Sequence, residues 1–258
     1  MVTPDAALAE AKTALKIIEI ARKQGWLDRL VTLLRRKHKI LVLGSSGVGK
    51  TACVESLTWT VPRTIDQMNR TQFAQKHSIR LARQPFIFID TPGQKLHGPR
   101  RLEAIRDAMK GRISGIVNVV SYGYHEYRIG KDVAIRADGA AREEFLRRHR
   151  QMEIQALSEW SSLLGGRDAA NWLITLVTKA DLWWGHRHRV LQHYSEGAYF
   201  EALGPAKALN PTVLEYCSVF QKFFGQAAMS GEFGDADRTR VRGQLIATLL
   251  ASVGEADS

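Results

Sequence analysis

Eight consecutive residues near the start of the chain combine small side chains with one ammonium group and one hydroxyl. The stretch GSSGVGKT, residues 44–51, fits the pattern G-x-x-x-x-G-K-[ST] and follows the apolar run KILVL. Its glycines let the backbone wrap with N–H groups pointing inward, so that a phosphate chain can lie against them and against the positive end of the following helix. The pattern therefore predicts a phosphate-binding loop, in preference to a glycine-rich turn without a ligand.

Two side chains at the end of this loop add a charge and a metal ligand. Lys50 is expected to bridge the outer phosphates, and the Thr51 hydroxyl is expected to bind Mg²⁺. The backbone between the glycines would supply the other contacts. The residues predicted to line the phosphates are Ser46, Gly47, Val48, Gly49, Lys50, Thr51 and Ala52.

Two further motifs follow, each at the end of an apolar run. DTPG occupies residues 90–93 and is followed by Gln94, and TKAD occupies residues 178–181. In their order and context, GSSGVGKT, DTPGQ and TKAD resemble the motifs of the Ras-like GTPases of the translation-factor-related class. The resemblance covers roughly residues 38–252 and implies a guanine nucleotide as the ligand.

The resemblance implies a role for each residue near the base. Asp181 would accept hydrogen bonds from the ring N–H and the exocyclic amine of guanine, whereas adenine would leave this carboxylate unpaired. Lys179 would lay its aliphatic stem along the base, and Thr178 stands where the family more often has Asn. Cys217 and Ser218 resemble the weak fifth motif, in which the Ser218 N–H is favoured as the donor to the guanine oxygen.

The resemblance also implies a metal site and a hydrolytic site. Asp90 would hold Mg²⁺ through water, Gly93 would donate its N–H to the γ-phosphate, and Gln94 would orient the attacking water. Lys50 would offset the negative charge that develops during hydrolysis. The alternative for Gln94 is a polar loop residue without this role.

The switch threonine, a further expected metal ligand, has two candidates. Thr71 stands about midway between the other two metal ligands, a spacing similar to that of Arf-type and bacterial Era-type GTPases. Thr64, in PRTID, resembles the Ras-type wording but comes earlier. Thr71 is favoured because mobile loops tolerate changes in length.

Departures from the family pattern bear on the rate of hydrolysis. Ser46 crowds the route by which an arginine from an activating partner would reach the phosphate, and Gly47 stands where potassium-stimulated GTPases have Asn. Arg63 and Arg70 flank the candidate threonines, where solvated arginines are favoured over an internal arginine finger. We therefore expect slow intrinsic hydrolysis.

The chain from about residue 38 onward alternates strands with helices. The strand candidates are residues 39–44, 77–82, 85–90, 115–122, 171–181 and 212–218, and the helix candidates are 50–59, 99–110, 140–164, 188–202 and 237–252. This order predicts an α/β fold, a P-loop NTPase G domain with a mostly parallel central sheet and helices on both faces. The longest of these helices has an apolar stripe of Phe145, His149, Met152, Ala156, Trp160 and Leu163.

The remaining segments are interpreted by position. Residues 1–37 are predicted to form an N-terminal helical extension, and residues 38–258 the G domain. An apolar stripe within residues 4–36 is expected to dock on the G domain, with partner binding or a homodimer as the alternative. Residues 60–75 are expected to be mostly loop. Residues 123–139, with the tyrosines around them, fit a partner-binding loop about as well as a plain surface loop.

Composition narrows the class of protein. The 258 residues are 45% hydrophobic and 24% charged, which is typical of a globular protein, and neither a secretory signal nor a membrane-spanning run is visible. Two cysteines, Cys53 and Cys217, suit a reducing compartment, so a cytoplasmic location is expected. The net charge of +11 attracts phosphates, nucleic acid or anionic lipid.

These features predict a GTP-binding molecular switch that uses Mg²⁺ to hydrolyse GTP to GDP and regulates a protein partner. Two alternatives stay open. One is a nucleotide-locked binding module with little or no hydrolysis. The other is a basic GTPase that acts at RNA or at an anionic membrane surface, which salt-sensitive binding would reveal.

Overall fold

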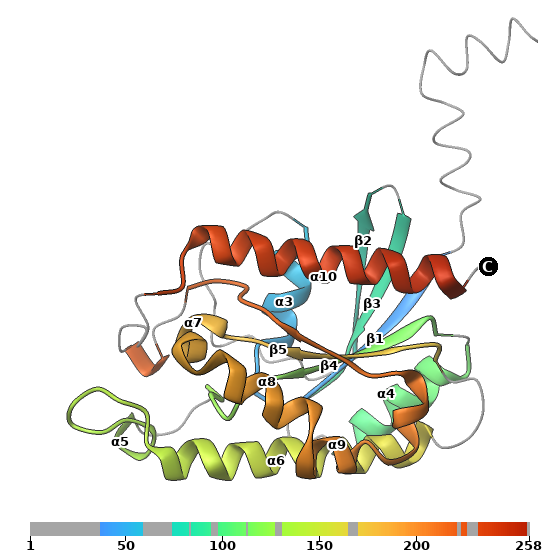
Figure 1. The fold of residues 1–258 in the computed structure, drawn as a ribbon. Coiled ribbons are helices and arrows are strands. Elements are labelled where there is room, and N and C mark those ends of the chain that lie inside the picture. Colours follow the sequence, from blue (N-terminus) through green and yellow to red (C-terminus); the bar gives the residue numbers. More distant parts are fainter. Residues whose placement is uncertain are drawn as a thin grey trace, which may run out of the picture.

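The computed structural model of the protein describes residues 37–58, 74–82, 84–93, 98–111, 113–126, 131–164, 170–220, 223–225 and 232–256. Within these ranges, strands form one sheet in the order β2-β3-β1-β4-β5-β6 (Figure 1). The strands are β1 (His38–Leu43), β2 (Gln75–Leu81), β3 (Gln84–Asp90), β4 (Gly115–Val120), β5 (Leu173–Val177) and β6 (Thr212–Glu215). Among the strand pairings of the described residues, β2–β3 is antiparallel and the other four are parallel, so the predicted mostly parallel sheet is confirmed.

The central strands are apolar on both faces. Every residue of β4 and β5 is buried, and so is every residue of β1 except Lys39. Continuous apolar runs of this kind are typical of parallel strands with helices on both sides. The edge strand β2 differs, because it exposes Lys76 and Arg80 along a sheet edge where charge discourages pairing with another chain.

Helices cover both faces of the sheet (Figure 1). On one face lie α3 (Lys50–Ser56) and α10 (Asp235–Ala256), and on the other lie α4 (Gly98–Met109), α6 (Glu143–Ser161), α8 (Arg187–Ser195) and α9 (Gly197–Ala202). The shorter turns are α5 (Lys131–Ala134), η2 (Ser162–Leu164), α7 (Ala180–Trp183), η3 (Trp184–His186), η4 (Gly204–Leu209) and η5 (Phe223–Gly225). Each face has its own apolar core, one around Val54 and Leu249 and the other around Leu157 and Trp160.

The parallel strands deliver their carboxyl ends to one edge of the sheet. The backbone there continues the ladder for one more residue, since Thr91 N donates to Val42 O, Thr178 N to Val120 O and Tyr216 N to Val177 O. In open α/β sheets this edge is where ligands bind. Every motif singled out in the sequence follows one of these strand ends.

Two predicted helices differ from the structure in detail. The buried side of α6 includes Glu153 and Leu157, whereas Met152 and Ala156 of the predicted stripe are only half-buried. A pattern based on apolar residues misses this buried face of α6, because one of its members, Glu153, is a carboxylate. The predicted helix at 188–202 is interrupted at Glu196, which is extended (φ −139, ψ 173) between α8 and α9.

Several predicted features lie outside the described residues. These are the helix at 4–36, the loop at 60–73 with both candidate switch threonines, Thr64 and Thr71, and the residues 127–130. The part of the connection at 123–139 that is described includes the short helix α5 and a bridge between Ile135 and Ala141. In the described ranges, no helix combines the length and the apolar character that crossing a bilayer requires.

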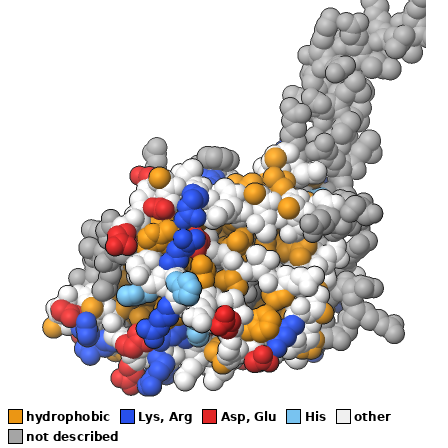
Figure 2. Space-filling model, in the orientation of Figure 1, with side chains coloured by type: hydrophobic (Ala, Val, Ile, Leu, Met, Phe, Trp, Pro, Cys, Tyr) orange, Lys and Arg blue, Asp and Glu red, His pale blue; other side chains and the backbone are white. Residues whose placement is uncertain are grey.

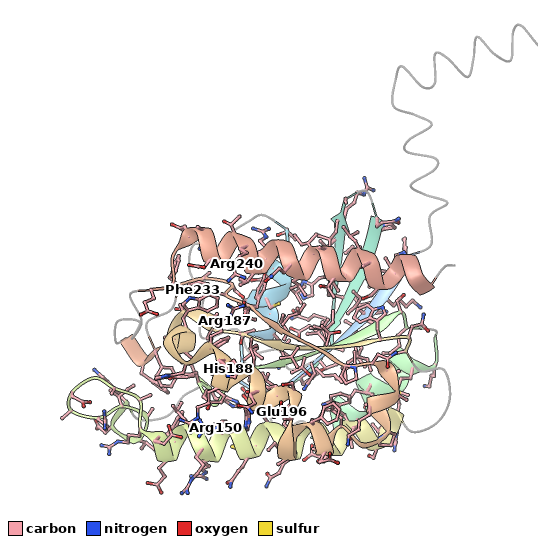
Figure 3. All side chains as sticks on the ribbon, in the orientation of Figure 1. Arg150, Arg187, His188, Glu196, Phe233 and Arg240 are labelled. Carbon is pink, nitrogen blue, oxygen red and sulfur yellow. The ribbon has the colours of Figure 1, made fainter. Side chains whose placement is uncertain are left out.

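One face of the molecule carries a column of basic side chains over α10, α8 and α6 (Figure 2). Arg240, Arg187 and Arg150 lie along it (Figure 3). Their charges are partly compensated, because Glu215 pairs with Arg187 at 2.7 Å and with Arg240 at 3.4 Å, and Arg150 pairs with Glu143. The column is thus less cationic than the net charge of the chain suggests.

Candidate functional site: a phosphate loop and a base pocket

The loop after β1 needs glycine at three positions. At Gly44 (φ +138), an added Cβ would lie 2.2 Å from Val119 O, and at Gly47 (φ +79) it would lie 2.6 Å from Glu126 O. Gly49 (φ +90) is left-handed at the start of α3. A side chain at any of these positions would be strained by the positive φ, and at Gly44 and Gly47 it would also clash with nearby backbone atoms. The loop can therefore wrap closely with its peptide groups available to a ligand.

Lys50 joins this loop to the segment after β3. Lys50 is 7% exposed, and its ammonium group donates to Gly44 O and Ser45 O, each at 3.0 Å. Gly93 lies so near that an added Cβ would be 2.4 Å from Lys50 Nζ. The structure thus brings the first two motifs together around one buried cation, which suits the binding of phosphate oxygens.

Thr51 and Asp90 form the expected hard-oxygen pair. Thr51 Oγ1 donates to Asp90 Oδ2 at 2.7 Å, and Asp90 is fully buried at the end of β3. A hydroxyl and a carboxylate are the ligands that Mg²⁺ takes alongside phosphate oxygens and water. No group of three or more His, Cys, Asp or Glu within the described ranges could hold a metal ion by itself. The donor set fits a Mg²⁺ ion that is completed by a phosphate ligand.

Lys179 lies at the other end of the site, before α7. Its backbone is left-handed (φ 59), and its ammonium group is buried, donates to Tyr124 O at 2.7 Å and lies 3.9 Å from Glu126 Oε2. Burial lowers the pKa of Lys179 to about 8, although the nearby carboxylates of Glu126 and Asp181 favour its charged form. The hydrogen bond to Tyr124 O and the nearby Glu126 carboxylate therefore fix the position of the Lys179 ammonium group.

Asp181 and the segment after β6 meet, as the two base motifs were expected to do. The Cys217 thiol donates to Asp181 Oδ1 at 3.4 Å, and Ala180 N donates to Tyr216 O at 3.0 Å. Burial, and after it the negative charge of Asp181, raises the pKa of the Cys217 thiol. The sulfur therefore stays protonated and acts as a donor. Ser218 follows at the half-buried rim.

Thr178 ties the phosphate loop to the sheet. Its hydroxyl lies 2.5 Å from Val48 O and 2.9 Å from Val120 O. Trp183 is buried and donates its indole N–H to Thr178 O at 2.8 Å, which makes it a packing residue of the core. The hydroxyl of Thr178 therefore supports the loop from below, a role that the sequence did not indicate.

The other predicted site residues have simple positions. Ser46 is half-buried in the loop, Val48 is fully buried beneath it, and Ala52 is half-buried in α3. Gln94, the candidate for orienting water, lies outside the described residues, as do Arg63 and Arg70.

The sequence missed one contributor, the segment 121–126 that follows β4. Tyr124 O receives Lys179, and Glu126 N donates to Gly47 O at 3.2 Å. The signal that could have found it is the wording SYGYHE after a buried strand, in which Gly123 adopts φ +85. The segment closes the gap between the phosphate loop and the base motif.

The chain was also compared with known protein families and structures. Residues 39–155 match the sequence model of the family described as 50S ribosome-binding GTPase. The match covers less than half of the chain; it includes the first two motifs and ends before TKAD. A search of the curated proteins found no match.

A solved structure also resembles the chain. It comes from the signal recognition particle receptor SRb-GTP/SRX complex of Chaetomium thermophilum, with 13% identity over 80% of this chain and 96% of that chain and a TM-score of 0.48. This likeness is too distant to bear on function. The sheet order, the phosphate loop and the matched family nevertheless agree: the chain contains a GTP-binding P-loop G domain.

Proposed function

We propose that the protein is a molecular switch that binds GTP, hydrolyses it slowly to GDP with Mg²⁺, and regulates a protein partner. The observation that carries this proposal is the convergence of four segments, distant in the chain, at one sheet edge. Lys50 with Gly93 forms the phosphate end, and Asp181 with Cys217 forms the base end. The proposal also places the protein in the Ras-like, translation-factor-related class of GTPases.

Guanine selectivity follows from the chemistry of Asp181. The carboxylate is 1% exposed and is oriented on one oxygen by Cys217. Guanine presents two donors on its edge that can pair with such a carboxylate. Adenine presents no such pair, so binding ATP would leave a buried charge poorly satisfied, a cost of about 1–3 kcal/mol or more.

Hydrolysis in such a site depends on position and charge. A bound Mg²⁺ ion would neutralise charge on the β- and γ-phosphates of GTP. Thr51 and Asp90 are the residues that would hold it, with Thr71 as the proposed third protein ligand. Lys50 stabilises negative charge on the phosphates, and Gln94 is proposed to orient the attacking water.

The switching role depends on the segments that face the γ-phosphate. Loss of this phosphate removes the contacts that order such segments in GTPases, here the residues around Thr71 and Gly93. A protein that reads their arrangement would distinguish the GTP-bound from the GDP-bound form. This argument supports a protein partner as the reader of the switch.

RNA is a second candidate partner, favoured by the net charge of +11. The basic column on α10, α8 and α6 weighs against it, because Arg187 and Arg240 pair with Glu215 and also stack on Trp184 at 5.0 and 5.4 Å. RNA affinity that falls steeply as the salt concentration rises would favour this candidate. RNA affinity that does not change with salt concentration would exclude it.

Nucleotide selection provides the test of the proposed function. Calorimetry should show micromolar or tighter binding of GTP and GDP and far weaker binding of ATP. Asp181→Asn should shift preference toward xanthine nucleotides, whose ring carries a carbonyl where guanine carries its amine. Lys50→Ala should abolish tight binding of every nucleotide. Equal affinity of the wild-type protein for ATP and GTP would refute the proposal.

A further inference from the structure

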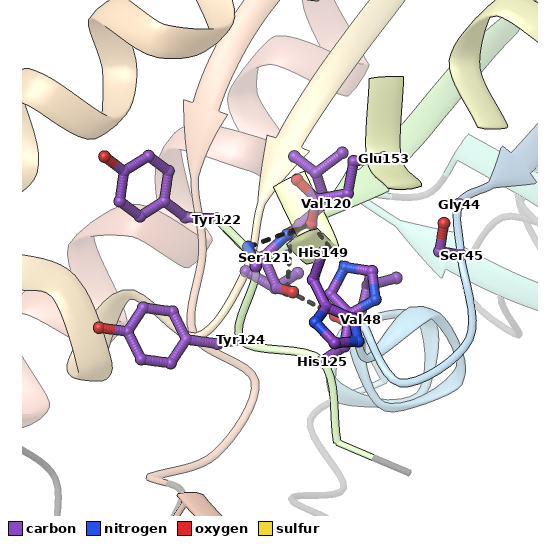
Figure 4. Close-up of polar contacts among 12 residues, drawn as sticks. Gly44, Ser45, Val48, Val120, Ser121, Tyr122, Tyr124, His125, His149 and Glu153 are labelled. Carbon is purple, nitrogen blue, oxygen red and sulfur yellow. Dashed lines mark hydrogen bonds and ion pairs between the residues drawn. The ribbon is translucent and has the colours of Figure 1, made fainter. Parts of the chain in front are cut away.

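A buried carboxylate on α6 holds the segment that follows β4 (Figure 4). Glu153 is 2% exposed, and its Oε1 accepts hydrogen bonds from Ser121 N at 2.9 Å and Gly123 N at 3.4 Å. His125 Nε2 lies 2.8 Å from the same oxygen. Tyr194 OH, from α8, donates to Oε2 at 2.6 Å. One carboxylate therefore gathers four groups from two different elements.

Glu153 is held in its charged form by these donors. Burial alone would raise its pKa, but the hydrogen bond and charge of His125 and the bonds from Tyr194 and Ser121 N together keep the pKa below its usual value. A buried charge of this kind is a poor route to stability, since an apolar side chain of similar size often serves as well. What the carboxylate supplies is a fixed direction for each donor.

The segment that Glu153 holds is sharply bent. Tyr122 (φ 53) and Gly123 (φ 85) are consecutive left-handed residues. An added Cβ at Gly123 would lie 2.3 Å from Leu146 O, so the turn lies directly against the backbone of α6. Tyr122 N also donates to Tyr194 OH at 2.8 Å. A turn with this backbone needs outside contacts to keep it in place.

The other end of the segment contacts three parts of the site and its surroundings: Lys179, the phosphate loop and the turn beyond the last strand. Tyr124 O accepts from Lys179 Nζ at 2.7 Å, and Glu126 N donates to Gly47 O at 3.2 Å. Glu126 Oε1 accepts from Phe224 N at 3.3 Å, beyond the last strand. Movement of the residues that Glu153 holds, Ser121 to His125, would therefore displace Lys179 at the base end of the site. The phosphate loop keeps its own supports, the glycine geometry and the bond from the Thr178 hydroxyl to Val48 O.

We propose that Glu153 is a positioning residue for the base end of the nucleotide site. It acts through residues 121–126, which it fixes against α6 and in which Tyr124 O in turn holds Lys179. Among the described residues, the hydrogen bonds of Glu153 go to Ser121, Gly123, His125 and Tyr194, and its effect on Lys179 is otherwise a weak charge interaction that favours the ammonium form. The proposal rests on the proposed function, because it assumes that a guanine nucleotide occupies the pocket.

Two probes separate the base end of the site from its phosphate end. GDP uses both ends, whereas pyrophosphate with Mg²⁺ uses only the phosphate loop. Glu153→Gln keeps the size of the side chain but replaces one acceptor oxygen with a donor. By calorimetry it should raise the Kd of GDP about tenfold and leave the Kd of pyrophosphate within about twofold.

Matched variants keep the test decisive. Tyr194→Phe removes the hydroxyl that serves both Glu153 and Tyr122 N but keeps the ring, and it should weaken GDP binding in the same selective way. Leu157→Val, one turn along α6 in the apolar core, should lower the melting temperature without changing the Kd of GDP. If Glu153→Gln does not fold, Tyr194→Phe gives the answer.

Three results would overturn the proposal. They are unchanged GDP affinity in both Glu153→Gln and Tyr194→Phe, an equal loss of GDP and pyrophosphate binding, and an equal rise in the Kd of GDP in Leu157→Val. Hydrogen exchange without nucleotide adds an independent readout. Faster exchange in residues 121–126 and 178–181 of Glu153→Gln would support the positioning role even if wild-type protein bound no GDP and the proposed function failed; unchanged exchange would refute it.

Discussion

Cys217 and Asp181, separated by 36 positions, meet through a thiol that donates to a carboxylate oxygen at 3.4 Å. The contact joins the end of β6 to the start of α7, the two segments that flank the proposed base pocket. A thiol is a weaker donor than a hydroxyl, and this one also lies 3.2 Å from Val219 O, so it fixes the orientation of Asp181 with a modest interaction. In the proposed complex the two donors of guanine would pair with this carboxylate.

The first prediction concerns this thiol. Cys217→Ala removes the donor, and we expect the Kd of GDP to rise about threefold to tenfold, because Asp181 loses the group that fixes its orientation. Cys217→Ser restores a donor of similar size and should bind GDP at least as tightly as the wild type. Calorimetry on both variants measures the difference. Identical affinity in Cys217→Ala and Cys217→Ser would mean that the contact is only packing.

The second prediction concerns the metal ligands. Thr51→Ala removes the hydroxyl that lies 2.7 Å from Asp90, and we expect it to reduce by about tenfold the gain in GTP affinity that Mg²⁺ provides. Binding without Mg²⁺ should change little. Thr58→Ala is the control, since its exposed hydroxyl donates to Glu55 O at the end of α3 opposite to Thr51. Titration of GTP with and without Mg²⁺ gives the comparison, and a full Mg²⁺ effect in Thr51→Ala would contradict the assignment.

The third prediction contrasts two glycines. Gly47→Ala should prevent nucleotide binding, because its Cβ would clash with the backbone of Glu126 and its φ of +79 is strained for alanine. Gly243→Ala, within α10, meets nothing within 4 Å and should raise the free energy of unfolding by about 0.5–1 kcal/mol through helix propensity. Urea unfolding and GDP titration test both. Tight GDP binding by Gly47→Ala would show that the loop tolerates a different path.

The fourth prediction concerns acid stability. Burial lowers the pKa of His149 to about 4, although Phe145 O accepts a hydrogen bond from its Nδ1 at 2.7 Å. Between pH 6.5 and pH 4 the unfolded chain binds a proton here that the folded chain does not, so this residue makes the folded state less stable as the pH falls. His149→Gln keeps a donor to Phe145 O but does not titrate.

Urea unfolding at pH 7 and pH 5 measures this effect. The wild type should lose about 2 kcal/mol more than His149→Gln over that interval. The difference reports His149 together with its charge interactions with His125 and Glu153, which the substitution also removes. An equal loss in the two proteins would show that His149 is charged in the folded state.

The fifth prediction is the rate of hydrolysis. A glutamine that orients water supplies little charge compensation, and intrinsic turnover of Ras-type GTPases without an arginine finger is on the order of 10⁻⁴ s⁻¹. We expect the isolated protein to turn over below about once per minute, and Gln94→Ala to be slower still. Single-turnover hydrolysis measures both. Rapid turnover that survives Gln94→Ala but is lost in Arg70→Ala would assign the catalytic role to an internal arginine.

The motifs and the alternation of strands with helices could be read from the sequence because both depend on local patterns. A glycine-rich loop after an apolar strand predicts its own geometry, and Asp90 and Thr178 were expected at strand ends, where the structure has them. The supports of the site could not be predicted in this way. Glu153 acts on residues about thirty positions earlier, and a buried carboxylate in a helix is indistinguishable in sequence from an exposed one until its partners are placed.

The parallel sheet also determines when the site can exist. β1 pairs with β3 and β4, and β4 pairs with β5, so each pairing joins segments that are far apart in the chain, such as His38 with Phe86 and Ile116 with Leu173. Topologies of such high contact order fold slowly, since long loops must close before the contacts form. During synthesis the phosphate loop leaves the ribosome long before Asp181 and Cys217. A nascent chain therefore has no complete nucleotide site until β6 has emerged and paired, and guanine nucleotide should stabilise only the finished fold.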